Sequence, residues 1–436
     1  MGCINEIGAK QKADNVSGLL GEYSLKIFYE SRSPKLPQGF LLRIGIDDFK
    51  NINESHGNEY GDYILRRTAQ CIEENIGPEQ SLFHIVADEF AVVDFSGGSV
   101  ETAEKLFHEI KKSIYAFIEQ NQYKAVYTVS GGIVENGDVD NSFENAMKLS
   151  EFALSQAKER GKNSCYVFEQ KEYEDYLKSR TLLRQLHHAV NNGFEGFEAY
   201  FQPLVNAANG ELTGAETLLR FHSPEGGMVS PGEFIPILEE SGLIIPVGRW
   251  VLRQALDACR EWQKILPEFK VNVNLSYVQV LKSRVLTDVR RIVDEFGVKP
   301  SSVCIELTES GYLEENERFD KVWNGLKEYG VLLALDDFGT GYSNLRCLSD
   351  LKPAYIKIDR SFTLKALNRE YEYRLLNHIV EMSHSLGLHV CVEGIETEGE
   401  LTKAKQTEPD YIQGFLFGKP CSRAEFTQKF FTKQAG

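Results

Sequence analysis

Residues 331–341 read VLLALDDFGTG. Five apolar residues lead to two adjacent carboxylates, Asp336 and Asp337, and the chain then turns between two glycines. A buried strand presents charge at its carboxyl end in this way, which is typical of an active site. For this segment alone, the alternative is a surface turn whose aspartates cap the next helix. Other strands nearby end in the same way and favour the active site.

The second half of the chain alternates strands with helices after Asn191. Its short apolar runs lie at 198–205, 212–221, 271–276, 303–310, 331–337, 355–360, 389–396 and 411–418. Eight such runs in about 250 residues are typical of a (β/α)₈ barrel. The first two runs are too close in sequence for a helical crossover. We therefore predict a modified α/β barrel that is irregular at its start.

Polar residues stand at the late positions of these runs. They are Glu216, Asn274, Glu306, Glu309, Asp336, Asp337, Lys357, Glu393 and Gln413. Because the carboxyl ends of parallel strands open on one face of a barrel, we expect these side chains to converge. Carboxylate and amide oxygens suit Mg²⁺ or Mn²⁺. Two such ions, roughly 3.5–4 Å apart, would bind the attacking and leaving oxygens of a phosphate ester, so the pattern predicts its hydrolysis.

Each residue taken singly also has a simpler interpretation. Glu216 could be an exposed charge at a strand end. Lys357 could point outward from a half-buried strand, and Asn274 could close a turn. The complete set favours the site.

Composition limits the class of protein. The 436 residues are too many for one ordinary core and indicate two domains. A hydrophobic content of 42% with 26% charged residues is typical of a globular protein. We find neither a signal peptide nor an apolar run of about 18 residues, and so predict a cytoplasmic protein with no membrane span. The eight cysteines are scattered singly, and a net charge of −16 argues against binding to DNA or RNA.

The first half mixes helices and strands in an α+β pattern. Runs at 41–49, 89–95 and 125–134 predict strands, and residues 104–120 predict an amphipathic helix. A charged segment at 169–190 has Leu and Tyr at helical spacing. We therefore place a first domain at 14–170, a connecting helix at 171–190 and the barrel domain at 191–432.

Residues 198 to about 430 resemble the EAL domain, the family of cyclic di-GMP phosphodiesterases. The signature stands as Glu216-Thr217-Leu218, with threonine in place of alanine. The segments that follow the family order are YFQPLV, ETLLR, VNVNLS, IELTES, LDDFGTGYSNL, YIKIDRSF, VEGIET and YIQGFLFGKP. Ala354 departs from the aspartate that the family often has there. The resemblance implies hydrolysis of cyclic di-GMP to linear pGpG.

The resemblance also implies the ligands of two divalent metal ions, Mg²⁺ or Mn²⁺. The first ion would be held by Glu216, Asn274, Glu306 and Asp336. The second would share Asp336 and be completed by Asp337 and Glu393. Lys357 would orient the attacking water or stabilise the charge of the transition state, and Glu393 is the other candidate for assisting proton removal.

Further positions are implied by the same resemblance. Glu309 would anchor the loop 338–344, which couples metal occupancy to a homodimer formed through the barrel. The substrate would be bound by Gln202, Arg220 and Gln413; the planar fork of an arginine suits a phosphate.

Residues 14–170 resemble the GGDEF domain, the diguanylate cyclase family, in a degenerate form. The segment at 46–65 keeps Asn53 and Asp62, which bind guanine in the family, and Lys158 and Lys162 match positions that contact the triphosphate. The signature reads Val86-Ala87-Asp88-Glu89-Phe90 and lacks both glycines. Gly45 stands where the family has its first metal-binding aspartate.

Three functions follow from these patterns. The first is an active cyclic di-GMP phosphodiesterase whose first domain is an inactive regulator that binds GTP or nothing. The second is a catalytically silent cyclic di-GMP receptor that acts through a protein partner. The third, a bifunctional cyclase and phosphodiesterase, is disfavoured by Gly45 and the altered signature. The beginning of the chain so close to Asp14 is consistent with a segment of a longer sensor protein.

Overall fold

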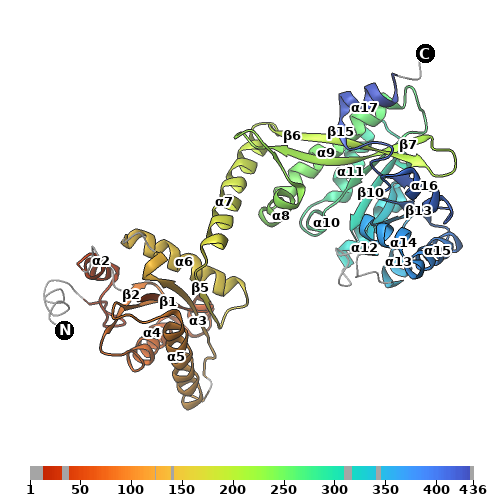
Figure 1. The fold of residues 1–436 in the computed structure, drawn as a ribbon. Coiled ribbons are helices and arrows are strands. Elements are labelled where there is room, and N and C mark those ends of the chain that lie inside the picture. The colour runs from red at the N-terminus through yellow and green to blue at the C-terminus, as the bar shows by residue number, and fades with distance from the viewer. Residues whose placement is uncertain are drawn as a thin grey trace. The chain divides into compact units, whose positions relative to one another are not determined.

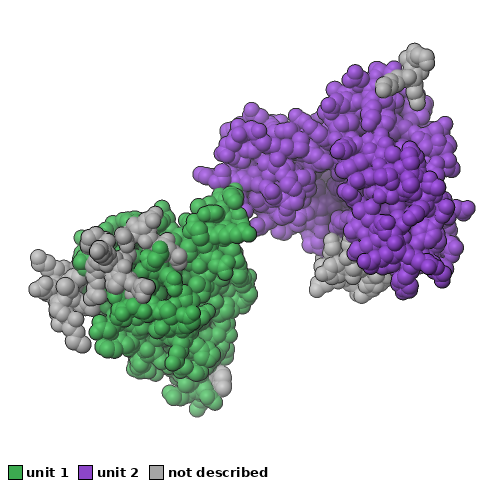
Figure 2. Space-filling model, viewed as in Figure 1, with its two compact units in different colours: residues 1–178 green, residues 179–436 purple. Residues whose placement is uncertain are grey.

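The structure is a computed structural model, and it describes residues 13–31, 39–122, 124–138, 142–308, 317–339 and 345–432. The chain divides into two compact units, residues 1–178 and 179–436 (Figure 2). The division falls inside α7 (Gln170–Asn191), the helix predicted at 169–190. The predicted domain limits themselves stay a prediction.

The first unit is built on a mixed five-stranded sheet in the order β2-β3-β1-β4-β5 (Figure 1). The strands are β1 (Phe40–Ile46), β2 (Gln80–Val86), β3 (Glu89–Asp94), β4 (Val129–Glu135) and β5 (Cys165–Val167). β1 lies in the centre and pairs antiparallel with β3 and β4. The three predicted strands are present as β1, β3 and β4, whereas β2 and β5 carry no clear apolar alternation and were not predicted.

Helices cover both faces of this sheet. They are α2 (Glu22–Glu30), α3 (Phe49–His56), α4 (Asn58–Glu73), α5 (Val100–Gln120) and α6 (Phe143–Glu159). Phe40, Leu42 and Ile44 pack in one cluster with α4 and α5, while Leu41 packs in another with α2 and α6. Because β1 is buried on both faces, its sequence FLLRIGI does not alternate between apolar and polar residues; its one charged residue, Arg43, is buried as well.

The altered signature forms the turn between β2 and β3. Ala87 adopts a φ of 51°, in the left-handed region where a Cβ is unfavourable. Its carbonyl oxygen lies 3.0 Å from Nε2 of His84. We expect Ala87→Gly to stabilise this unit by about 0.5–1 kcal/mol, because relief of the strain outweighs the extra chain entropy of glycine. Calorimetric unfolding of the full chain measures this, and an unchanged or lowered transition for residues 1–178 would contradict it.

The second unit is a closed barrel of eight strands. In spatial order they run β6-β14-β13-β12-β11-β10-β9-β7, and β7 pairs back to β6. Their bounds are β6 (Phe197–Asn206), β7 (Leu212–His222), β9 (Lys270–Asn274), β10 (Val303–Thr308), β11 (Leu332–Phe338), β12 (Tyr355–Ile358), β13 (His389–Val392) and β14 (Tyr411–Gln413). The short strands β8 (Met228–Val229) and β15 (Cys421–Ser422) extend its sheet.

The barrel is irregular where the sequence predicted it. β6 and β7 form an antiparallel hairpin, and β6 is also antiparallel to β14. The other neighbouring pairs around the barrel are parallel. The prediction that no helical crossover joins the first two strands is confirmed.

Helices surround the strands of the barrel (Figure 1). They are α8 (Pro231–Ser241), α9 (Ile244–Trp262), α10 (Tyr277–Lys282), α11 (Val285–Phe296), α12 (Glu317–Tyr329), α13 (Leu345–Leu351), α14 (Arg360–Asn368), α15 (Glu370–Ser385), α16 (Glu398–Lys405) and α17 (Arg423–Phe430). Among the described residues, no helix has both the length and the apolar character that crossing a membrane requires.

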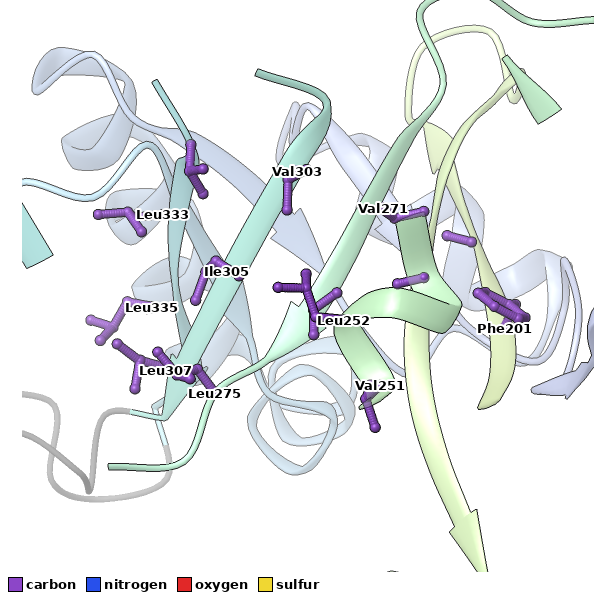
Figure 3. Close-up of a cluster of buried hydrophobic side chains, with 14 of the residues drawn as sticks. Phe201, Val251, Leu252, Val271, Leu275, Val303, Ile305, Leu307, Leu333 and Leu335 are labelled. Atoms are coloured by element: carbon purple, nitrogen blue, oxygen red, sulfur yellow. The ribbon is translucent and has the colours of Figure 1, made fainter. Parts of the chain in front are cut away.

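Side chains of the barrel strands alternate between the helices and the lumen. Val303, Ile305 and Leu307 of β10 pack in the apolar cluster between strands and helices (Figure 3). The alternate residues of the same strand, Cys304 and Glu306, therefore face the lumen. Through the register with β9, Glu306 lies beside Asn274. The pleat and register of the strands thus bring the predicted strand-end residues Glu306 and Asn274 next to each other.

An ionic cluster fixes the amino end of β14. Asp410 accepts a hydrogen bond of 2.8 Å from the Val390 amide and lies 2.9 Å from His389 Nδ1 and 3.0 Å from His384 Nε2. Burial alone would raise the pKa of Asp410, but the His389, Val390 and His384 hydrogen bonds lower it below its usual value.

We expect Asp410→Asn to destabilise the protein by about 1 kcal/mol at pH 7, a value discounted because both histidines are partly exposed. A carboxylate with a lowered folded-state pKa contributes its stability above the unfolded-state value of about 3.9, and that stability is lost as pH falls through the folded-state pKa. The difference from the native protein should therefore shrink below about pH 4. Urea unfolding across pH measures it, and a difference that is unchanged at low pH would exclude this cause.

Candidate active site

Three buried carboxylates meet at the carboxyl end of the barrel strands. Glu216 on β7, Glu306 on β10 and Asp336 on β11 each place an oxygen so that all of these atoms lie within 4.8 Å of one another. All three residues are buried. The convergence that the sequence predicted for these residues is present, and Glu216 is not an exposed strand-end charge.

Lys357 on β12 lies at the centre of this cluster. Its Nζ is 3.2 Å from Glu216, 3.0 Å from Glu306, 3.4 Å from Asp336 and 2.8 Å from Glu393. The lysine residue is only 2% exposed. The interpretation of Lys357 as an outward-facing residue is therefore wrong: the side chain holds four carboxylates together.

Burial and mutual repulsion dominate the protonation of this cluster. Burial would lower the pKa of Lys357, yet the surrounding carboxylates raise it well above its usual value. Burial raises the pKa of Glu393 to about 8 and that of Glu306 well above its usual range, although Lys357 opposes both shifts. Burial likewise raises the pKa of Asp336. One ammonium is thus too little positive charge for these carboxylates.

Two side-chain amides also donate hydrogen bonds to Glu216. Nε2 of Gln413 donates to it at 2.7 Å, and Nδ2 of Asn274 donates at 2.9 Å. Burial would raise the pKa of Glu216, but Lys357 and these two hydrogen bonds lower it. Gln413 also donates to Oε1 of Gln202 at 3.1 Å, so both predicted substrate-binding glutamines lie next to Glu216.

Asp337 occupies a bend at the end of β11. The register with β12 is interrupted between Leu335 and Phe338, and Asp337 adopts a φ of 59°. Burial, followed by the charge of Asp336, raises the pKa of Asp337 to about 6. Asp337 is not a member of the three-carboxylate cluster, and its predicted role as a ligand of a second ion stays a prediction.

The sequence analysis did not identify Asn272. This buried residue of β9 donates from Nδ2 to Oε1 of Glu306 at 2.7 Å. It precedes Asn274 by two residues, so both side chains face the lumen. The alternation within VNVNLS was the available signal. Asn272 orients a carboxylate, as the hydrogen-bonding partners of metal ligands do.

A cavity of about 610 Å³ opens beside the carboxylates. Asn274 and Arg220 line it together with residues of α8, α9 and α10. The guanidinium of Arg220 lies 5.5 Å from the centre of the Tyr200 ring and donates to the Leu219 carbonyl at 2.8 Å. Arg220, one of the predicted substrate-binding residues, therefore lines an open space.

Glu309 and residues 340–344 of the predicted loop lie outside the described residues. The anchoring role of Glu309 and a homodimer through the barrel domain stay predictions of the family resemblance.

In the first unit, a lysine lies beside Gly45, the position where the family resemblance leads one to expect a metal-binding aspartate. A Cβ added to Gly45 would lie 2.9 Å from Nζ of Lys158. Nζ of Lys162 lies 2.7 Å from both carboxylate oxygens of Asp48. Of the two predicted triphosphate contacts, Lys158 thus lies beside the Gly45 position and Lys162 is paired with Asp48. Asn53 lies on α3 and Asp62 on α4, both half-buried.

Asp47, next to Asp48, accepts three hydrogen bonds from protein donors. It accepts hydrogen bonds from Oγ1 of Thr128 at 2.6 Å, from Oγ of Ser130 at 2.7 Å and from the Asn163 amide at 3.1 Å. These bonds give it a structural role in joining β1, β4 and the end of α6.

The fold and the carboxylate cluster define an α/β-barrel protein with an acidic site at the carboxyl end of its strands. Residues 183–420 match the EAL domain family, and residues 24–164 match the family described as diguanylate cyclase, GGDEF domain. The chain belongs to the EAL domain family and carries a GGDEF domain in tandem.

The chain is similar to named relatives over most of its length. It is 29% identical over 381 residues to the bifunctional diguanylate cyclase/cyclic di-GMP phosphodiesterase MucR of Pseudomonas aeruginosa, covering 87% of this chain and 55% of MucR. It is 28% identical over 386 residues to the cyclic di-GMP phosphodiesterase PdeR of Escherichia coli, covering 88% of this chain and 58% of PdeR. The chain therefore spans little more than half of either relative.

Among solved structures, the PaMucR phosphodiesterase in complex with c-di-GMP is similar, with a TM-score of 0.53 and 32% identity. The match covers 56% of this chain and 99% of that one.

Proposed function

We propose that the barrel domain is a cytoplasmic phosphodiesterase that hydrolyses cyclic di-GMP to linear pGpG with two divalent metal ions. The observation that carries this proposal is the cluster of Glu216, Glu306 and Asp336 around Lys357, with oxygens within 4.8 Å of one another. Membership of the EAL family, relatives named as cyclic di-GMP phosphodiesterases and a similar structure in complex with c-di-GMP support it.

The residues present fit Mg²⁺ or Mn²⁺. The donor set consists of carboxylates and one amide, which are ligands for hard cations. When all are ionised, five carboxylates and Lys357 carry a formal charge of −4, which two divalent cations would balance; the carboxylates are Glu216, Glu306, Asp336, Asp337 and Glu393. Glu216, Asn274, Glu306 and Asp336 would hold one ion, and Asp336, Asp337 and Glu393 the other. Bound metal ions of this kind activate water and polarise phosphoryl oxygens.

The chain's own groups would position and neutralise the reacting atoms. Lys357 carries a fixed positive charge into the centre of the site, where charge develops on the phosphoryl oxygens in the transition state. Glu393 is the other candidate for accepting a proton from the attacking water. Arg220 would bind a substrate phosphate, and Gln202 and Gln413 would contact the ligand from beside Glu216.

Product analysis tests this proposal. The purified chain is incubated with cyclic di-GMP and Mg²⁺ or Mn²⁺, and a parallel sample contains excess chelator. We expect linear pGpG only where the cation is free. Binding of cyclic di-GMP without turnover would instead favour the silent receptor.

We propose further that the first domain has no cyclase activity and regulates the barrel. The support is Gly45, which supplies no carboxylate, and the Lys158 ammonium beside it. Asn53 and Asp62 remain for binding guanine, so the domain would bind GTP without converting it. Titration calorimetry with GTP on the full chain tests binding, and incubation of GTP with Mg²⁺ tests synthesis. Formation of cyclic di-GMP from GTP would contradict the proposal.

A further inference from the structure

A second cavity lies at the opposite end of the barrel, where the parallel strands begin. Its volume is about 360 Å³. The walls come from the first residues of four strands, Lys270, Leu332, Tyr355 and Tyr411. Further in, it is lined by Asn272, Cys304, Lys357 and Cys391. The amino end of an α/β barrel is usually filled by packed side chains, and this volume lies within the range of roughly 300–1,000 Å³ typical of ligand sites.

The walls are aromatic and carry polar groups at their edges. The rings of Tyr355 and Tyr411 have their centres 5.7 Å apart, and His389 lies 5.2 Å from Tyr355. Nζ of Lys270 is 3.2 Å from the Tyr355 hydroxyl. Such a lining suits a flat ring with hydrogen-bonding groups on its rim.

The charges around the mouth limit the ligand further. Glu211 and Glu268 line the cavity, Asp410 lies beside His389, and Lys270 is the cation among the described residues at this opening. Asn206 and Asn209 add amides. A phosphate at the mouth would face Glu211 and Glu268 against Lys270 alone, because Lys357 further in is already paired with four carboxylates. An uncharged ring that carries both donors and acceptors would find partners for both in this lining.

Two residues of this cavity also contact the catalytic carboxylates from below. Asn272 donates to Glu306 at 2.7 Å, and Nζ of Lys357 lies 3.0 Å from the same side chain. A molecule in the cavity would contact the side chains of Asn272 and Lys357, which both hold Glu306. It could therefore change the position of Glu306 without entering the catalytic mouth.

We propose that this cavity is a regulatory site for an uncharged planar heteroaromatic molecule of nucleoside size. The regulatory part rests on the proposed phosphodiesterase function, whereas the binding part does not.

Binding is tested on the full chain with adenosine as the probe, by saturation-transfer NMR and calorimetry in the presence of chelator and excess cyclic di-GMP. We expect adenosine to bind, adenosine 5′-monophosphate to bind about tenfold more weakly, and ribose not to bind. Tyr411→Leu removes a stacking surface and should weaken adenosine binding by about tenfold. Leu332→Trp should fill the cavity and abolish binding. Tyr371→Leu is the matched control, because Tyr371 is 78% exposed on α15, away from the lining residues.

Circular dichroism and the melting temperature identify variants that fail to fold. If one of Leu332→Trp and Tyr411→Leu fails to fold, the other still tests the site. Absence of adenosine binding to the native chain, or binding that both cavity variants leave unchanged, overturns the site. If adenosine binds there but changes cyclic di-GMP hydrolysis by less than twofold, the regulatory part is wrong. Absence of hydrolysis in every sample would contradict the phosphodiesterase function instead and leave the binding result intact.

Discussion

Replacing Glu216 by glutamine is expected to lower cyclic di-GMP hydrolysis by more than about 100-fold, since loss of an outer hydrogen-bonding partner of a metal ligand already costs about 10–100-fold. Glu216 is a proposed metal ligand, and donors surround it: Gln413, Asn274 and Lys357 lie at 2.7, 2.9 and 3.2 Å. A glutamine amide would turn one acceptor into a donor and repel at least one of them. Initial rates at saturating Mn²⁺ and substrate measure the effect.

Glu328→Gln is the matched control for this substitution. Glu328 is an exposed residue of α12, so we expect its replacement to leave the rate unchanged. A Glu216→Gln protein that folds normally and retains more than a tenth of the activity would show that Glu216 is not a metal ligand.

Replacing Lys357 by methionine is expected to destabilise the chelator-treated protein by about 3–5 kcal/mol, the effect of removing one partner from a buried ion pair. Four carboxylates lie within 3.4 Å of its Nζ and would lose their only buried cation among the described residues. Mn²⁺ at the proposed ion sites would supply positive charge at the same place in the folded state, so it should stabilise the variant more than the native protein. Urea unfolding with chelator and with Mn²⁺ measures both effects.

Lys321→Met controls for the loss of a lysine at the surface. The Lys321 side chain is 78% exposed and its Nζ lies 3.7 Å from Glu317, so its loss should change stability by less than about 1 kcal/mol. A Lys357→Met protein that is as stable as the native one in chelator would contradict the claim that the Lys357 ammonium stabilises the buried carboxylates. Equal stabilisation of both proteins by Mn²⁺ would show that the cation binds elsewhere.

The architecture of the barrel could be predicted from sequence because its signals are local. The apolar runs that became β9 to β14 are short, repeated and separated by helices, and the few residues between β6 and β7 exclude a crossover. Glu216, Glu306, Asp336 and Lys357 could be selected because parallel strands bring their ends to one face. The barrel topology brings these residues together, and the alternation of strands and helices along the sequence already implies that topology.

The remaining features depend on contacts across strands, which single segments do not show. The hydrogen bond from Asn272 to Glu306 follows from the register of β9 and β10. The place of Lys357 among four carboxylates depends on side-chain conformations on four strands and on that of Glu393, just after β13. Lys158 on α6 lies beside Gly45 on β1, although the two residues are more than 100 positions apart in the sequence. The cavity beneath the site likewise results from what the lumen side chains leave unfilled.

The central claim is tested most directly by mass spectrometry of the product formed from cyclic di-GMP in ¹⁸O-labelled water with Mn²⁺. Hydrolysis by the proposed route forms a bond from the water oxygen to phosphorus and releases the 3′ oxygen as a hydroxyl. We therefore expect linear pGpG with one ¹⁸O on its 5′-phosphate, and no product when the cation is chelated. A product with its phosphate on the 3′ oxygen, an unlabelled product, or equal turnover in chelator would contradict the account.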